Sequence, residues 1–189
     1  MKEQTSIVVL VQRVVGQPKD LVEVLVVEQP VLDRGTHEAF NRSPTLKVPV
    51  LPAAILASLP PAPRVVEIGV GGRFDLLATV AERFPKAHLV AVDVDPHALE
   101  GAPRDVHAHV DDVHDPHRAL YRGADLLVAR RPPVELQLAI ARLARTHEAG
   151  LAMAALKDEW ADLADELEPP QIPDDAGSWR WWPPRSVDR

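Results

Sequence analysis

The sequence predicts an α/β protein with a doubly wound, parallel β-sheet. Three observations lead to this prediction: short apolar segments alternate with amphipathic ones after residue 63, a glycine-rich turn follows the first of these segments, and an acidic residue ends the next. Parallel strands need crossover connections, which are nearly always right-handed. We therefore expect a Rossmann-like sheet, preceded by an N-terminal β-hairpin extension.

The first 50 residues differ in pattern from the rest. Residues 6–15 and 21–28 are rich in β-branched side chains and flank a turn-like stretch at 16–20, which predicts an antiparallel hairpin. Residues 29–49 have mixed polarity and no clear period, as linkers do. The chain is thus expected to have three parts: a hairpin and linker extension over 1–50, a Rossmann-like domain over 51–168, and a Pro- and Trp-rich tail over 169–189.

The elements of the Rossmann-like domain follow in order. A short apolar helix is expected at 52–58. Five strands and two helices are then expected from the change between short apolar runs and helical spacing: strands in RVVEIG, HLVAVD, DVHAHV, YRGADLLVA and GLAMAAL, and helices in RFDLLATVAERF and PVELQLAIARLARTHE. Only about thirty residues follow the fifth strand, so we expect the sheet to be truncated there.

The segment after the fifth strand, EWADLADELE, is expected to form one acidic helix before a proline-broken tail. Trp179, Trp181 and Trp182 in that tail are expected to dock at the sheet edge, with stacking on a base as the alternative. Little chain is therefore left to close this side of the sheet. We expect a second subunit in a homo-oligomer or the N-terminal hairpin to complete it, or else this side stays open.

Composition excludes several classes of function. The chain has 28 acidic against 21 basic residues, a net charge of −7, so nucleic acid is not the expected partner. It has no cysteine, which excludes disulfide frameworks and thiolate metal sites and fits a cytoplasmic location. Apolar runs long enough to span a bilayer, roughly 20 residues, are lacking, so no membrane partner is expected.

The glycine-rich turn EIGVGGRFD carries the clearest binding signal. Gly69 permits the tight reversal, Gly71 lets ligand atoms approach the backbone, and the helix that follows offers unpaired N–H groups. Phe74 occupies the third glycine position of the dinucleotide fingerprint, which disfavours a nicotinamide cofactor. Glu67 suits a cationic ligand such as the amino group and sulfonium of S-adenosylmethionine, although it could equally be a capped or solvated strand end.

Two aspartates complete the expected cofactor site. Asp93 ends the second strand, where nucleoside-binding α/β folds place a carboxylate on the ribose hydroxyls. Asp95 is expected to be an N-cap, and Asp112, after the third strand, is the candidate for the adenine amino group. Histidines and aspartates gather between residues 107 and 117. Strand alternation sends His107 and His109 to one face, but the loop residues that follow have no fixed spacing, so no metal site is expected.

The loop after the fourth strand, ARRPPVE, suggests a substrate contact. Amino-directed methyltransferases have Asp/Asn-Pro-Pro-aromatic at this point, whereas here Arg131 replaces the acceptor and Val134 the ring. Methylation of an exocyclic amine by that route is therefore not expected. Arg131 would instead hold a carboxylate or phosphate of the substrate, and a salt bridge to Glu135 or Asp112 is an equal alternative.

Taken together, RVVEIGVGGRFD, VAVDVDP, VDDVHDP, LYRGADLLVARRPPVEL and AALKDE resemble the uncharacterised protein family 0146, a small, mostly archaeal family similar to class I S-adenosylmethionine methyltransferases. The resemblance covers about residues 64–158 and implies S-adenosylmethionine as cofactor. Gly72 is an additional glycine relative to the family spacing, and residues 1–50 have no matching counterpart.

Two functions are compatible with these features. The first is a small methyltransferase of unknown acceptor, in which Asp111 or His114 could take a proton if the acceptor is a hydroxyl. The second is a non-catalytic nucleoside-binding or partner-subunit module of the same fold. A NAD-binding oxidoreductase is disfavoured.

Overall fold

The computed structural model describes residues 6–13, 22–29, 51–156, 159–173 and 177–184 of the chain. The chain divides into two compact units, Met1–Leu46 and Lys47–Arg189. In the first unit, β1 (Ser6–Arg13) pairs antiparallel with β2 (Val22–Gln29), with Ser6 opposite Gln29. The turn predicted at 16–20 and the linker predicted after the hairpin lie outside the described residues.

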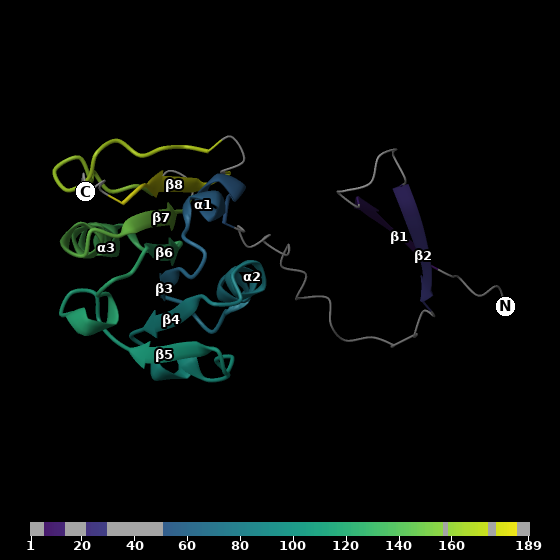
Figure 1. Ribbon diagram of the computed structural model, residues 1–189, viewed down its shortest axis with the longest axis horizontal. Coiled ribbons are helices and arrows are strands. Elements are labelled where there is room, and N and C mark those ends of the chain that lie inside the picture. The colour runs from purple at the N-terminus through teal and green to yellow at the C-terminus, as the bar shows by residue number, and fades with distance from the viewer. Residues whose placement is uncertain (1–5, 14–21, 30–50, 157–158, 174–176, 185–189) are drawn as a thin grey trace, which may run out of the picture. The chain divides into compact units, whose positions relative to one another are not determined.

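The second unit contains a six-stranded sheet with the order β5-β4-β3-β6-β7-β8. Its first five strands in sequence are parallel, and β8 runs antiparallel to β7 (Figure 1). The strands are β3 (Arg64–Ile68), β4 (His88–Asp93), β5 (Val106–Val110), β6 (Leu126–Arg130), β7 (Gly150–Ala154) and β8 (Trp179–Trp182). The predicted parallel α/β sheet is thus confirmed for its first five strands.

The expectation that the sheet stops after its fifth strand is wrong. The tail adds β8 to the edge of β7, where Trp179 and Trp182 are 2% and 5% exposed. Prolines bracket the Trp-Arg-Trp-Trp run without interrupting it, and tryptophan favours strands. The prediction that the tryptophans dock at the sheet edge is confirmed, and the docking takes the form of a paired strand.

Helices cover both faces of the sheet (Figure 1). α1 (Ala53–Ser58) and α2 (Asp75–Arg83) pack on one face, and α3 (Val134–Thr146) packs on the other. Helices and strands alternate only in part, because the crossovers on either side of β5 contain the short 3₁₀ helices η1 (Pro96–Leu99) and η2 (Arg118–Leu120). Their sequences lack the apolar spacing that a longer amphipathic helix needs.

The prediction of an acidic helix after β7 is wrong. Residues 159–173 contain no helix and have a turn at 164–166. The side chain of Gln137 in α3 explains this difference. Its amide nitrogen donates to the carbonyl oxygen of Glu159 (2.7 Å), and its oxygen accepts from the amide of Ala161 (2.9 Å). Gln137 is fully buried, and these bonds to the backbone replace those of a helix.

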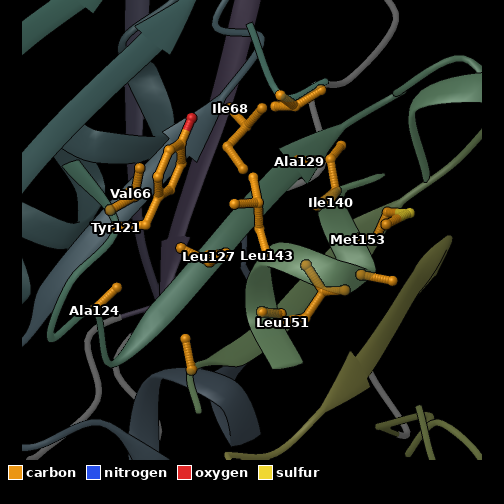
Figure 2. Close-up of a cluster of buried hydrophobic side chains, with 14 of the residues drawn as sticks. Val66, Ile68, Tyr121, Ala124, Leu127, Ala129, Ile140, Leu143, Leu151 and Met153 are labelled. Atoms are coloured by element: carbon orange, nitrogen blue, oxygen red, sulfur yellow. The ribbon is translucent and has the colours of Figure 1, made fainter. Parts of the chain in front are cut away.

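Each face of the sheet has its own apolar core because side chains alternate along a strand. In β3, Val65 packs with α1 and α2, whereas Val66 packs with α3. Figure 2 shows the α3 side, where Leu127 of β6 and the ring of Tyr121 are completely buried. This core fixes the carboxyl ends of β3, β4 and β6, at which the predicted site residues lie.

Candidate functional site

A cavity of about 330 Å³ lies at the carboxyl ends of the central strands. Its lining comes from the ends of β3 and β4, the loop after β5, and α3: Ile68, Gly69, Val92, Asp93, Val94, Asp111, Asp112, Val113, His114 and Leu136. The strand order changes direction between β3 and β6. Open α/β sheets bind ligands at such a switch point, outside the carboxyl ends of the strands.

The glycine turn forms part of this cavity. Gly69 and Gly71 have left-handed backbones with φ angles of 70° and 55°, which favour glycine over other residues. The Gly69 amide donates to the carbonyl oxygen of Val92 (2.7 Å), which fixes the start of the turn against β4. Open space surrounds the missing Cβ positions of both glycines, so ligand atoms can reach the backbone there.

Asp93 links the glycine turn to the end of β4. Its carboxylate accepts from the amides of Gly71 (2.9 Å) and Asp95 (3.0 Å), and its side chain is half-buried. A carboxylate has about four acceptor positions, so two remain for a ligand. The predicted N-cap role of Asp95 is confirmed, because its side chain accepts from the amide of His97 (2.9 Å).

The loop after β5 is held by a buried tyrosine. The Tyr121 hydroxyl donates to Asp111 Oδ2 (2.6 Å), while Asp111 Oδ1 accepts from the amide of His117 (2.9 Å). Burial, together with the hydrogen bond to Asp111, raises the pKa of Tyr121 well above its ordinary value. Asp112 lines the cavity and accepts from the amide of His114 (2.9 Å).

Glu67 lies on the other face of the sheet and does not line this cavity. Its side chain is 0% exposed and Oε1 accepts from Arg130 Nε (2.7 Å), so the interpretation as a solvated strand end is wrong. Oε2 has no hydrogen-bond partner among the described residues. Burial raises the pKa of Glu67 to about 7 against the lowering effect of Arg130. Its direct contact with a ligand stays a prediction.

Arg131 follows β6 in a left-handed conformation with φ 55°. Its amide donates to the carbonyl oxygen of Ala154 (2.6 Å), and its side chain is half-buried. Within the part of the chain that the structure describes, Arg131 forms no ion pair, so neither expected bridge, to Glu135 or to Asp112, is present. Its role toward a substrate anion stays a prediction.

Sequence reasoning missed two residues that shape the site. Arg130 lies in an apolar strand, at a position that is buried. A buried arginine needs a carboxylate partner, and this requirement is the signal that could have linked Arg130 to Glu67. Tyr121 gave no such signal, because nothing in the local pattern shows that its hydroxyl meets Asp111, ten residues earlier.

The described residues lack two further kinds of feature, a metal-binding cluster and a membrane-spanning helix. They contain no cluster of three or more histidine, aspartate or glutamate side chains arranged to hold a metal ion. They also contain no helix with the length and apolar character needed to cross a membrane.

A model of the uncharacterised protein family UPF0146 matches residues 50–167. The chain belongs to this family. A UPF0146 protein of Halobacterium salinarum is 37% identical over 108 residues, which are 57% of this chain and 80% of the relative. A UPF0146 protein of Methanocaldococcus jannaschii is 33% identical over 97 residues, 51% of this chain and 69% of the relative. The resemblance inferred from the motifs is confirmed, and the match is wider than residues 64–158.

Solved structures of methyltransferases are similar to this UPF0146 chain at low identity. The antibiotic-resistance methyltransferase Kmr is 16% identical with a TM-score of 0.48, over 68% of this chain and 88% of Kmr. PKMT2 from Rickettsia typhi, solved in complex with AdoHcy, is 19% identical with a TM-score of 0.42, over 49% of this chain and 20% of PKMT2. Likeness at this level carries no argument about activity, which has to be derived from the chain's own residues.

Proposed function

We propose that this UPF0146 protein binds S-adenosylmethionine in the cavity at the carboxyl ends of β3 and β4 and acts as a small methyltransferase. The observation that carries the proposal is the joining of Asp93 to Gly71 at the cavity, because one carboxylate then both shapes the glycine turn and keeps acceptor positions for a ribose. The cavity volume of about 330 Å³ is at the lower end for ligand sites.

The charges around the cavity favour a cationic ligand. Asp93, Asp111 and Asp112 all line it, and among the residues that the structure describes no lysine or arginine does. Carboxylates attract a sulfonium and repel a pyrophosphate, so S-adenosylmethionine fits this lining better than NAD does. Asp93 would hold the ribose hydroxyls and Asp112 the adenine amino group.

When bound, S-adenosylmethionine supplies an electrophilic methyl group, and the chain's part is to position the acceptor. The chain's residues would hold the acceptor's lone pair in line with the methyl–sulfur bond, and the thioether of the cofactor would be the leaving group. If the acceptor is a hydroxyl, its proton goes to Asp111 or His114, both of which line the cavity. Arg131 would hold an anionic group of the acceptor molecule.

A non-catalytic ligand-binding module is the second candidate. The observation that favours it is the Pro-Pro loop, where Val134, 41% exposed, occupies the place of the aromatic ring that orients an amine acceptor. Both candidates require ligand binding, and only the first requires methyl transfer.

Isothermal titration of the purified protein with S-adenosylhomocysteine, beside NAD, tests the proposal. We expect binding of S-adenosylhomocysteine with a Kd of about 1 μM, on the order of −8 kcal/mol, and none of NAD. The variant Asp93→Ala should lose affinity by about tenfold or more, since a hydrogen bond to a charged group contributes about 1.5–3 kcal/mol.

The matched control is Asp105→Ala, which removes an exposed carboxylate just before β5. Asp105 lies at the amino end of that strand, whereas the cavity lies at the carboxyl ends. This variant should bind like the wild type. Absence of binding by the folded wild-type protein would overturn the proposal, and unchanged affinity in Asp93→Ala would overturn the role of Asp93. If the ligand binds, transfer of a labelled methyl group to cell-extract acceptors distinguishes the enzyme from the module.

A further inference from the structure

Four hydrogen bonds converge on one buried guanidinium group beside the glycine turn. Arg130 Nε donates to Glu67 Oε1 (2.7 Å), and Nη1 donates to both carboxylate oxygens of Asp75 (2.9 and 2.8 Å). Nη2 donates to the carbonyl oxygen of Arg73 (3.0 Å). Arginine has five N–H donors in a fixed planar fork, so these bonds set the directions in which its partners lie.

The partners of Arg130 belong to two different parts of the fold. Glu67 lies in the central strand β3, whereas Arg73 ends the glycine turn and Asp75 begins α2. The side chains of Arg130 and Glu67 are 2% and 0% exposed, and that of Asp75 is 53% exposed. The guanidinium therefore connects the interior of the sheet to the outer end of the turn.

Within the glycine turn, Val70 packs into the core on the α2 side and is 1% exposed, whereas the residues after it have no such packing. Gly71, Gly72 and Arg73 are exposed, and the two glycines are in the left-handed region. Asp93 holds the turn from the β4 side through the Gly71 amide (2.9 Å). The bonds from Arg130 are the matching attachment at the other end. Exposed glycine backbone is otherwise free to change conformation.

We propose that Arg130 is a positioning residue for the ligand site, which fixes the backbone of residues 69–75 by joining Glu67 in the sheet to Arg73 and Asp75. Its role in ligand binding rests on the proposed function. Glu67 orients the guanidinium, and Asp75 and the Arg73 carbonyl receive its outer nitrogens. Lysine could not replace this arginine, because an ammonium group cannot make the forked contacts.

Variants of Asp75 test the proposal without leaving a charge unpaired in the core, because Arg130 keeps Glu67. Asp75→Ala removes both acceptors of Nη1, and Asp75→Asn keeps one oxygen acceptor. The matched control is Glu166→Ala, which breaks the ion pairs of Glu166 with Arg142 and Arg145 (2.8 and 2.7 Å) on the α3 side of the sheet.

The first readout needs no ligand. Amide hydrogen exchange at Gly71 and Arg73 reports the turn directly, because these amides donate to Asp93 and to the Val70 carbonyl oxygen. We expect Asp75→Ala to speed exchange at both amides by about tenfold relative to the wild type, Asp75→Asn to have a smaller effect, and Glu166→Ala to have none. Unchanged exchange in Asp75→Ala would overturn the proposal.

The second readout is the Kd for S-adenosylhomocysteine, measured where every variant is fully folded. It should rise by about fivefold in Asp75→Ala, less in Asp75→Asn, and not at all in Glu166→Ala. An equal rise in Glu166→Ala would overturn the positioning role, because general destabilisation would then explain it. If the wild type binds no ligand, the proposed function fails, while the exchange rates still decide whether Arg130 fixes the turn.

A paired variant removes the cluster altogether. Glu67→Gln combined with Arg130→Met leaves no unpaired charge buried in the core, so the protein is expected to fold. We expect exchange at the Gly71 and Arg73 amides to be at least as fast as in Asp75→Ala. Exchange as slow as in the wild type would overturn the proposal.

Discussion

Replacing Tyr121 with phenylalanine tests how the loop after β5 is held. The substitution removes only the hydroxyl that donates to Asp111 Oδ2 (2.6 Å). The ring is 0% exposed and phenylalanine keeps it, so the apolar packing on the α3 side stays the same (Figure 2). Any loss of stability therefore reports the hydrogen bond.

The magnitude follows from the charge and the exposure of Asp111. A hydrogen bond to a charged group contributes about 1.5–3 kcal/mol. In the variant, Asp111 keeps its hydrogen bond from the amide of His117. Because Asp111 is only half-buried, water can replace part of the stabilisation that the tyrosine hydroxyl provides. We expect Tyr121→Phe to lower the free energy of unfolding by about 2 kcal/mol, which moves the urea midpoint by roughly 1 M.

The assay is urea unfolding of four proteins: wild type, Tyr121→Phe, Asp111→Asn and the double variant. The two single losses should not add, with a coupling energy of about 1–2 kcal/mol for residues in direct contact. Additive losses, or a loss below about 0.5 kcal/mol in Tyr121→Phe, would refute the reasoning. The slope against urea should stay unchanged.

Alkaline titration gives a second test, because Tyr121 is the only tyrosine in the chain. Its pKa is raised above the ordinary value of 10.0 by burial and by Asp111, so the folded protein keeps a proton that the unfolded chain loses. Stability should fall as the pH rises above 10, and tyrosinate absorbance should appear only with unfolding. Titration of the folded protein at the ordinary value would contradict this.

Two further predictions concern the core. The pKa of Glu67, raised from 4.5 to about 7, means that the folded state keeps a proton that the unfolded state loses, so this group lowers stability as the pH rises through that interval. Urea titrations give the free energies of unfolding of the wild type and of Glu67→Gln. The wild-type value minus the variant value should fall by about 3 kcal/mol over this pH range. A constant difference would contradict the burial of Glu67. Leu127→Ala, at a site with 0% exposure, should cost about 2–5 kcal/mol in the same assay. A cost below about 1 kcal/mol would mean that this position is not packed as described.

Local pattern predicted most of the elements because their causes are local. Short apolar runs such as Leu126 to Ala129, bounded by turn residues, are typical of buried strands, and the spacing of Leu136, Ile140 and Leu143 places one face of α3 on the sheet. The glycine turn and Asp93 were also predictable, since a βα turn needs left-handed backbone and an acceptor at fixed distances along the chain.

The errors came from contacts between distant segments. Residues 159–168 have an acidic, helix-like composition, but Gln137 binds their backbone and prevents the helix. The sixth strand depends on the exposed edge of β7, which takes up Trp179–Trp182 as a partner. Neither outcome is encoded in the segment itself, because a backbone hydrogen bond to another element can override local propensity.

The sequence by itself determined the parallel α/β class, the family and the position of the glycine turn, because periodicity and motifs act over a few residues. The tertiary structure decided which charges meet. Glu67 and Arg130 are 63 residues apart, yet they form a buried ion pair because β3 and β6 are neighbours and both side chains face α2. That placement gave Glu67 a partner inside the fold, since a carboxylate removed from water needs a nearby cation.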